Sequence, residues 1–310
     1  MANSSTTAEL MGLMHRFETV AIVANPVAGQ GRGRLTARQV RRRLESAGIK
    51  TTLIVDVPTA EPHDLASADA MIVIGGDGTL RAVAARCLQV RGNIPPLLPV
   101  PMGTANLMGR HLGINWSADN FADRIAQSLE SPKVAMLDAA QANGQLFLLM
   151  AGVGLDAMIV HELNRLRDGP INYISYAIPA ALALANYKYT PLEVEIDGIT
   201  VFPSARAMAF IANVSEYGTG FPVVPHARPD DGLLDLCVVP VDSPVDAIQK
   251  FLHAAAGELA QSEGVIYARG KQIEVRSTQP VPVQIDGDPA GYTPLAVNLL
   301  PMRVPFIVPV

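Results

Sequence analysis

The chain has 310 residues, enough for two domains that each bury their own apolar core. Its formal net charge is −5, which argues against a nucleic-acid binder, because such proteins carry a basic surface. The two cysteines, Cys87 and Cys237, lie in apolar segments, so we expect no disulfide framework and a cytoplasmic location.

The first predicted elements follow the order strand, loop, helix. Residues 20–24 form an apolar run typical of a buried strand, and the glycine-rich stretch NPVAGQGRG (25–33) follows as a loop. Apolar residues then recur at helical spacing, and Gly48 is placed to end that helix. A second strand is expected at 51–57, before a loop at 58–66 that passes into a short helix.

The next stretch, MIVIGGDGTL (71–80), places an aspartate among three glycines directly after a buried strand. Leu80 and the apolar residues after it recur at helical spacing, so the glycines form a tight loop at a helix start. Free backbone N–H groups at such a start, with glycines that admit a ligand close to the chain, are typical of a phosphate site. Asp77 would repel a bare phosphate. Either it caps the helix, or it acts through a metal ion and water network that accompanies the phosphates.

A further strand is expected at 97–100, and PMGTANLMGRHLG (101–113) again forms a loop that enters a helix. Alternating strands and helices predict a three-layer α/β domain with a mainly parallel sheet. Ligands of such sheets bind beyond the carboxyl ends of the strands, so the three glycine-bearing loops are expected to converge on one ligand. The loops match neither the dinucleotide pattern GxGxxG nor the phosphate-loop pattern GxxxxGK[ST].

After about residue 133 the pattern changes to short strands separated by hairpin signals. These signals are Asn143-Gly144, Asp197-Gly198 and Arg269-Gly270. They predict a mainly antiparallel β-sandwich, with helical insertions near 155–188 and 243–262.

The change of pattern divides the chain into a nucleotide-binding domain at 18–132 and a substrate domain at 133–310. Polar residues and a proline interrupt the apolar stretch 171–189. We therefore interpret that stretch as an amphipathic or buried helix rather than a membrane span.

Five stretches in this order resemble one known family. NPVAGQGRG, GGDGTL (75–80) and PMGTANLMGRHLG resemble the catalytic domain of the diacylglycerol kinase and sphingosine kinase superfamily of lipid kinases. DDGLLDL (230–236) and QIDGDPAG (284–291) resemble two motifs in the second domain of its soluble bacterial members. The resemblance implies an α/β domain like those of NAD kinases and diacylglycerol kinases, followed by a β-sandwich.

The resemblance also implies which residues surround ATP. They come from the three glycine-bearing loops and from a threonine after the second strand, although the stretch around that threonine lacks the usual glycine. The implied residues are Asn25, Pro26, Val27, Ala28, Gly29, Thr59, Gly75, Gly76, Asp77, Gly78, Thr79, Leu80, Thr104 and Asn106.

In bacterial members of the family a structural magnesium ion is held by one aspartate side chain and two backbone carbonyls. The matching residues here are Asp231 and the carbonyls of Arg228 and Leu233. Hard oxygen ligands of this kind suit Mg²⁺.

The family's DGE motif supplies the group that accepts the proton of the lipid hydroxyl. Here the motif reads DGD, so the shorter Asp288 stands at the glutamate position, and Asp286 is the alternative candidate for the base. Arg81 is a second departure, because the family commonly has asparagine there. In the implied mechanism Asp288 or Asp286 is the base, and Asp77 orders the metal and water network around ATP.

The expected function is therefore an ATP-dependent lipid kinase that acts on a diacylglycerol-like or sphingoid-like hydroxyl in the cleft between the domains. NAD kinase is the nearest alternative, since it shares GGDGT, but PMGTANLMGR favours the lipid kinase. A non-catalytic nucleotide or lipid sensor is the third reading. The expected partners are a lipid and, transiently, the inner face of a membrane, but no nucleic acid. The oligomeric state is left open, with a homodimer as one option.

Overall fold

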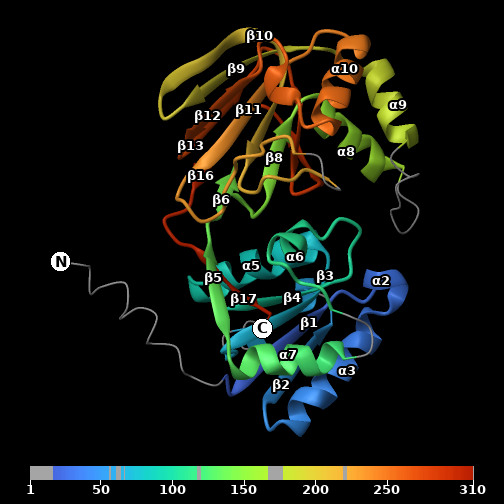
Figure 1. The fold of residues 1–310 in the computed structure, drawn as a ribbon, viewed down its shortest axis with the longest axis vertical. Coiled ribbons are helices and arrows are strands. Elements are labelled where there is room, and N and C mark those ends of the chain that lie inside the picture. The colour runs from blue at the N-terminus through green and yellow to red at the C-terminus, as the bar shows by residue number, and fades with distance from the viewer. Residues whose placement is uncertain are drawn as a thin grey trace, which may run out of the picture.

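A computed structural model of the chain describes residues 17–55, 57–60, 64–65, 67–116, 120–166, 177–218 and 222–309. The molecule has two parts stacked along its long axis, an N-terminal part with helices around a central sheet and a C-terminal part made mostly of strands (Figure 1). This division agrees with the change of pattern in the sequence.

The N-terminal sheet has six strands in the order β2-β1-β3-β4-β17-β5. The first four and β17 run parallel, and β5 is antiparallel to β17. The central strand β3 is buried along its whole length, as expected for a parallel sheet covered on both faces. The strands are β1 (Thr19–Ala24), β2 (Lys50–Val55), β3 (Ala70–Gly75), β4 (Leu97–Pro101), β5 (Lys133–Leu137) and β17 (Val304–Val308).

One face of this sheet is covered by α3 (Gly33–Ser46) and α7 (Phe121–Glu130) (Figure 1). The buried residues of α3 are four residues or fewer apart, which is the amphipathic spacing predicted from the sequence. The helix ends at Ser46, Ala47 caps it, and Gly48 follows with φ +80°, the left-handed conformation that glycine adopts after a helix.

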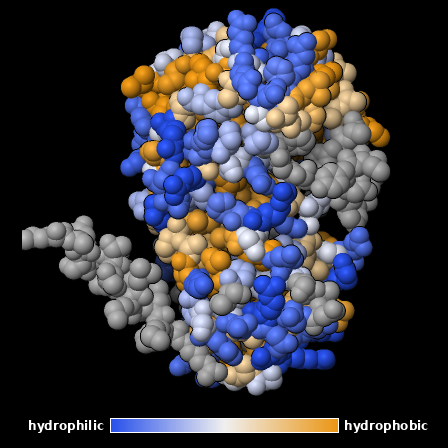
Figure 2. Space-filling view, in the orientation of Figure 1, coloured by the Kyte–Doolittle hydropathy of each residue, from blue (hydrophilic) through white to orange (hydrophobic). Residues whose placement is uncertain are grey.

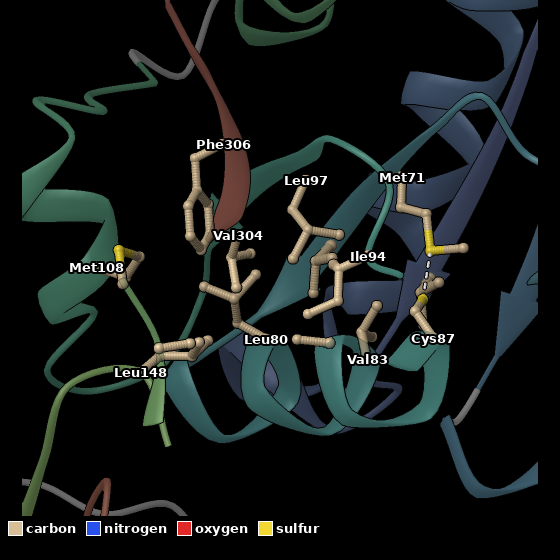
Figure 3. Close-up of a cluster of buried hydrophobic side chains, with 14 of the residues drawn as sticks. Met71, Leu80, Val83, Cys87, Ile94, Leu97, Met108, Leu148, Val304 and Phe306 are labelled. Carbon is tan, nitrogen blue, oxygen red and sulfur yellow. Dashed lines mark hydrogen bonds between the residues drawn. The ribbon is translucent and has the colours of Figure 1, made fainter. Parts of the chain in front are cut away.

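The other face carries α5 (Asp77–Arg91) and α6 (Leu107–His111), which lie between the sheet and the C-terminal part (Figure 1). Figure 3 shows Leu80 of α5, Phe306 of β17 and Leu148 of the C-terminal part in a single buried cluster. The two parts therefore share apolar packing, which holds their facing surfaces together.

The C-terminal sheet is a curled antiparallel sheet of eleven strands, a β-sandwich-like domain as predicted. The long strand β10 (Ile199–Ala212) joins its two halves, with irregular pairing near Phe202 where the strand bends. The other strands are β6 (Ala140–Ala142), β7 (Gln145–Phe147), β8 (Met150–Val153), β9 (Pro191–Ile196), β11 (Leu234–Pro240), β12 (Ile266–Gly270), β13 (Gln272–Arg276), β14 (Pro282–Ile285), β15 (Asp288–Tyr292) and β16 (Leu295–Leu299).

Among the described residues, the α-helices that accompany this sheet are α8 (Leu155–Arg165), α9 (Ala177–Asn186) and α10 (Pro244–Ala255). In the part of the chain that the structure describes, no helix is long and apolar enough to span a bilayer. Hydrophobic residues nevertheless lie on the surface of the C-terminal part near α10 (Figure 2), where Val245, Ile248 and Leu252 are exposed.

The structure differs from the predicted domain boundary at two strands. Both β5 and β17 complete the N-terminal sheet, although they lie beyond residue 132. A strand pattern shows that a segment is extended but does not show which sheet it joins, because pairing partners are distant in sequence.

The predicted hairpin at Arg269-Gly270 is also wrong. β12 pairs with β11 and β13 pairs with β9 and β16, so the chain passes between sheet halves at this point. Gly270 is needed for close packing instead, because a β-carbon there would collide with Ile196. The other two signals are confirmed, and both residues of each turn have positive φ.

Candidate active site

The first loop begins where β1 ends and is fixed at once to the neighbouring strand. The backbone N–H of Asn25 donates to Ile74 O at 2.9 Å, and its side-chain amide donates to Thr79 Oγ1 at 3.3 Å. Its side-chain oxygen accepts from the N–H of Val27 at 3.1 Å. Asn25 therefore connects the NPVAG loop to the GGDGT loop, as the expected convergence requires.

Gly29 connects the first loop to the third. Its N–H donates to Met102 O at 3.0 Å, and it adopts φ +58°. A β-carbon at this position would collide with the Met102 side chain, so both the conformation and the close contact favour glycine. The short helix α2 (Ala28–Gly31) is thus interrupted by left-handed residues and keeps the character of the predicted loop.

The second and third loops approach each other backbone to backbone. Met102 N donates to Gly75 O at 2.8 Å. A β-carbon on Gly103 would lie 2.6 Å from the Gly76 α-carbon, and one on Gly76 would lie 3.0 Å from the Gly103 α-carbon. All three loops therefore meet at one edge of the sheet, at the carboxyl ends of β1, β3 and β4.

Asp77 lies between these loops. Its carboxylate accepts the backbone N–H of Leu107 at 2.9 Å and that of Met108 at 3.1 Å. Burial raises the pKa of Asp77, while these backbone donors lower it. Asp77 is the first residue of α5, and the residue that caps that helix is Gly76. It ties the start of α6 to the GGDGT loop, and its role in a metal and water network stays a prediction.

Asn106 shapes the third loop from within. It adopts φ +51°, and its side chain accepts from Gly103 N at 2.7 Å and donates to Gly103 O at 2.8 Å. This clamp leaves Thr104 exposed at the tip of the loop. A nucleotide-facing position of Thr104 is compatible with that exposure.

A hollow of about 200 Å³ opens beside the phosphate loop. Asn25, Gly78 and Thr79 from the predicted set contribute to its wall. The complete lining is Asn25, Val57, Pro58, Gly78, Thr79 and Ala82. Thr59 ends the short helix η1 (Val57–Thr59), but its side chain lies outside the described residues.

The DGD motif is the turn of the hairpin between β14 and β15, with φ +49° at Asp286 and +83° at Gly287. The Asp286 carboxylate accepts three backbone N–H groups, from Leu148, Leu149 and Met150, at 2.9 to 3.0 Å. Burial raises the pKa of Asp286 to about 6, against the charge of Arg81 and these three donors. The Asp286 carboxylate is thus occupied by hydrogen bonds to the backbone of its own domain.

Asp288 points the other way, toward the N-terminal part. Its Oδ2 pairs with Arg81 Nη2 at 2.6 Å and lies 3.4 Å from where a β-carbon of Gly78 would be. The second nitrogen of the guanidinium, Nη1, donates to Ile285 O at 2.7 Å. Of the two candidate bases, Asp286 and Asp288, it is Asp288 that lies next to the phosphate loop.

Sequence reasoning missed the group of polar side chains behind the DGD turn. Gln284 is fully buried, accepts from Gly287 N at 2.9 Å and donates to Asp156 Oδ2 at 3.2 Å. The hydroxyl of Tyr217 donates to the other oxygen of Asp156. Burial raises the pKa of Asp156 to about 6, while these two partners lower it. The sequence feature that could have revealed this group is the presence of polar residues within apolar segments.

In the segment predicted to hold magnesium, the Asp231 side chain is engaged by other groups of the protein. Asp231 Oδ1 accepts from Leu233 N at 3.2 Å, and Oδ2 pairs with Arg269, which also binds Asp235. Among the described residues no group of three or more His, Cys, Asp or Glu side chains is placed to hold a metal, but the predicted site needs only one carboxylate and two backbone carbonyls. Arg269 thus occupies one oxygen of the only predicted side-chain ligand, and the ion expected at Arg228, Asp231 and Leu233 stays a prediction.

The chain matches two known domain families along nearly its whole described length. Residues 19–137 match the diacylglycerol kinase catalytic domain, and residues 150–308 match the YegS C-terminal NAD kinase beta sandwich-like domain. The chain belongs to the diacylglycerol kinase-like lipid kinase family.

Individual members of this family align over most of both chains. A diacylglycerol kinase of Bacillus subtilis (strain 168) is 26% identical, over 88% of this chain and 90% of its own. One from Mycobacterium tuberculosis (strain ATCC 25618 / H37Rv) is also 26% identical, over 95% and 96%. The crystal structure of a diacylglycerol kinase from Bacillus anthracis str. Sterne has a TM-score of 0.69 at 26% identity, covering 95% of this chain and 98% of that one. The resemblance inferred from the five motifs is thereby confirmed, as is the α/β plus β-sandwich fold of the diacylglycerol kinase-like family.

Proposed function

We propose that the protein transfers the γ-phosphate of ATP to the hydroxyl of a diacylglycerol-like or sphingoid-like lipid. The observation that carries this proposal is the position of Asp288, a carboxylate of the second domain that lies against Gly78 of the phosphate loop. A base in this place can take the proton of a hydroxyl that attacks a phosphate bound to the loop.

The nucleotide is proposed to bind along the three converging loops. The hollow beside Thr79 suits part of the nucleotide, and the partly exposed start of α5 offers backbone N–H groups to the phosphates. Magnesium enters with ATP and neutralises part of its charge. The chain's own contribution is to hold the phosphates in line with the acceptor hydroxyl, because positioning and charge stabilisation supply most of the catalysis in phosphoryl transfer.

We assign the base to Asp288 and a supporting role to Asp286. Three backbone N–H groups occupy the Asp286 carboxylate, whereas the Asp288 side chain is half exposed toward the cleft. Asp288→Asn should therefore lower kcat by about 10²-fold or more while leaving the unfolding temperature unchanged. Asp286→Asn should lower the unfolding temperature as well, because an amide offers only one acceptor oxygen to three donors.

The test of the function is phosphate transfer from γ-labelled ATP, with Mg²⁺ and mixed micelles of diacylglycerol, monoacylglycerol or sphingosine, and with NAD in a parallel reaction. Label in the organic phase is the expected result, and it identifies the acceptor class. Label on NAD alone would replace the proposal with the NAD kinase reading. ATP binding without transfer to any acceptor would favour a sensor.

A further inference from the structure

The two positions at which the chain departs from the family's motifs are in direct contact. The resemblance to the family leads us to expect asparagine at 81 and glutamate at 288, where this chain has Arg81 and Asp288. They are 207 residues apart in the sequence, yet Arg81 Nη2 lies 2.6 Å from Asp288 Oδ2. Taken alone, the shorter Asp288 would leave the base too far from the acceptor hydroxyl. Taken alone, Arg81 would be a cation beside the phosphates with no explained role.

The guanidinium of Arg81 is held at two points of the β14–β15 hairpin. Nη2 pairs with Asp288, and Nη1 donates to Ile285 O at 2.7 Å. The Arg81 side chain is only 17% exposed. Because a guanidinium is planar and its donors are fixed relative to one another, two contacts set its orientation as well as its distance.

Arg81 and Gly78 both belong to the first turns of α5. The same helix therefore carries the phosphate loop and the arginine that pairs with Asp288, the proposed base. Asp288 pairs with Arg81, and its Oδ2 lies 3.4 Å from where a β-carbon of Gly78 would be. An aspartate is one methylene shorter than a glutamate, and the longer arginine on the opposite side spans the remaining gap. The base is therefore held by the domain that holds the phosphates.

We propose that Arg81 is a positioning residue that compensates for the short acceptor side chain, because it draws the DGD hairpin toward α5 and fixes Asp288 over the phosphate loop. This inference rests on the proposed kinase function. It implies that the arginine and the aspartate work as a pair. The combination of asparagine at 81 with glutamate at 288 should form an equivalent pair.

The test is a kinetic cycle of wild type, Arg81→Asn, Asp288→Glu and the double variant, measured with labelled ATP and the best lipid acceptor. Each single change should lower kcat by about 10²-fold with little change in KM, since a misplacement of about 1 Å has that effect. The double variant should recover most of the loss. Arg86→Ala, which removes an arginine further along α5, is the control and should keep the wild-type kcat.

A double variant whose loss equals the product of the two single losses would overturn the proposal, as would an Arg81→Asn variant with the wild-type kcat. An ordinary structural ion pair would show its coupling in urea unfolding and leave kcat unchanged, so the same four proteins are also unfolded in urea. A wild-type protein inactive on every lipid would overturn the kinase function and this inference together. An active wild type with additive losses would overturn the inference alone.

Discussion

The α-carbons of Gly76 and Gly103 face each other so closely that neither position has room for a side chain. This contact brings the second and third loops together although α5 and β4 separate them in the chain. The shape of the phosphate site therefore depends on two glycines in different motifs.

Gly103→Ala should separate these loops. A β-carbon there would lie 2.6 Å from backbone that cannot move aside, so we expect a loss of about 1–3 kcal/mol in the free energy of unfolding. Binding of ATP should weaken as well, which calorimetry can measure. Gly198→Ala is the control: it lies in a distant hairpin with φ +81° and open space around it, and should cost roughly 1–2 kcal/mol without altering ATP binding.

Asp77→Ala should abolish turnover, because both backbone N–H groups at the start of α6 lose their acceptor and the third loop is released. Asp77→Asn keeps one acceptor oxygen and should lose less. The unfolding temperature and the ATP dissociation constant should change in the same order as kcat. Full activity in Asp77→Ala would show that turnover needs neither the Asp77 loop contact nor the predicted metal network.

The pH dependence of stability should report the buried Asp156. Its folded pKa of about 6 lies above the model-compound value of 3.8, so the folded state holds a proton that the unfolded chain releases between these values. The stabilisation from this group is complete below about pH 3.8 and is lost as pH rises through about 6.

Asp156→Asn cannot ionise, so it provides the comparison. The free energy of unfolding of the wild type minus that of Asp156→Asn should fall as pH rises from 4 to 7, as measured by urea unfolding at several pH values. A difference that stays constant over this range would show that Asp156 is not protonated in the folded protein at low pH.

The ion pairs of Arg269 predict that removal of magnesium leaves the fold unaffected. Because Arg269 already neutralises Asp231 and Asp235, the unfolding temperature without ATP should be equal in EDTA and in millimolar Mg²⁺. Arg269→Ala frees both carboxylates, and Mg²⁺ should then raise the unfolding temperature of the variant. A clear rise in the unfolding temperature of the wild type in Mg²⁺ would instead support the ion expected at Asp231.

Contact with a bilayer is a further prediction, since a lipid acceptor must be reached in a membrane. Val245, Ile248 and Leu252 are exposed and three or four residues apart on α10, so they share one side of the helix, and this surface can enter the headgroup region. Ile248→Asp combined with Leu252→Asp should lower the fraction that floats with diacylglycerol-containing vesicles. Ile199→Asp, at an equally exposed apolar site in the β9–β10 hairpin, should not.

The sequence determined the parts of this protein that depend on local physics. Alternating apolar runs and helical spacing predicted the order of the first strands and helices, and parallel strands place their following loops at one edge. The hairpins at Asn143-Gly144 and Asp197-Gly198 were predicted for the same reason, because few residues tolerate the positive φ that the structure shows at these turns. Asp286-Gly287 carries the same turn signal and also forms a hairpin turn.

The tertiary structure alone decided which sheet β17 joins, which carboxylate of DGD faces the phosphate loop, and what Arg81 contacts. In a two-residue hairpin turn the first aspartate folds back onto its own sheet, whereas Asp288 begins the next strand and reaches the other domain. Local patterns fix backbone conformation over a few residues. The contact between Arg81 and Asp288 joins residues 207 positions apart, and it exists only because the two domains pack against each other around α5.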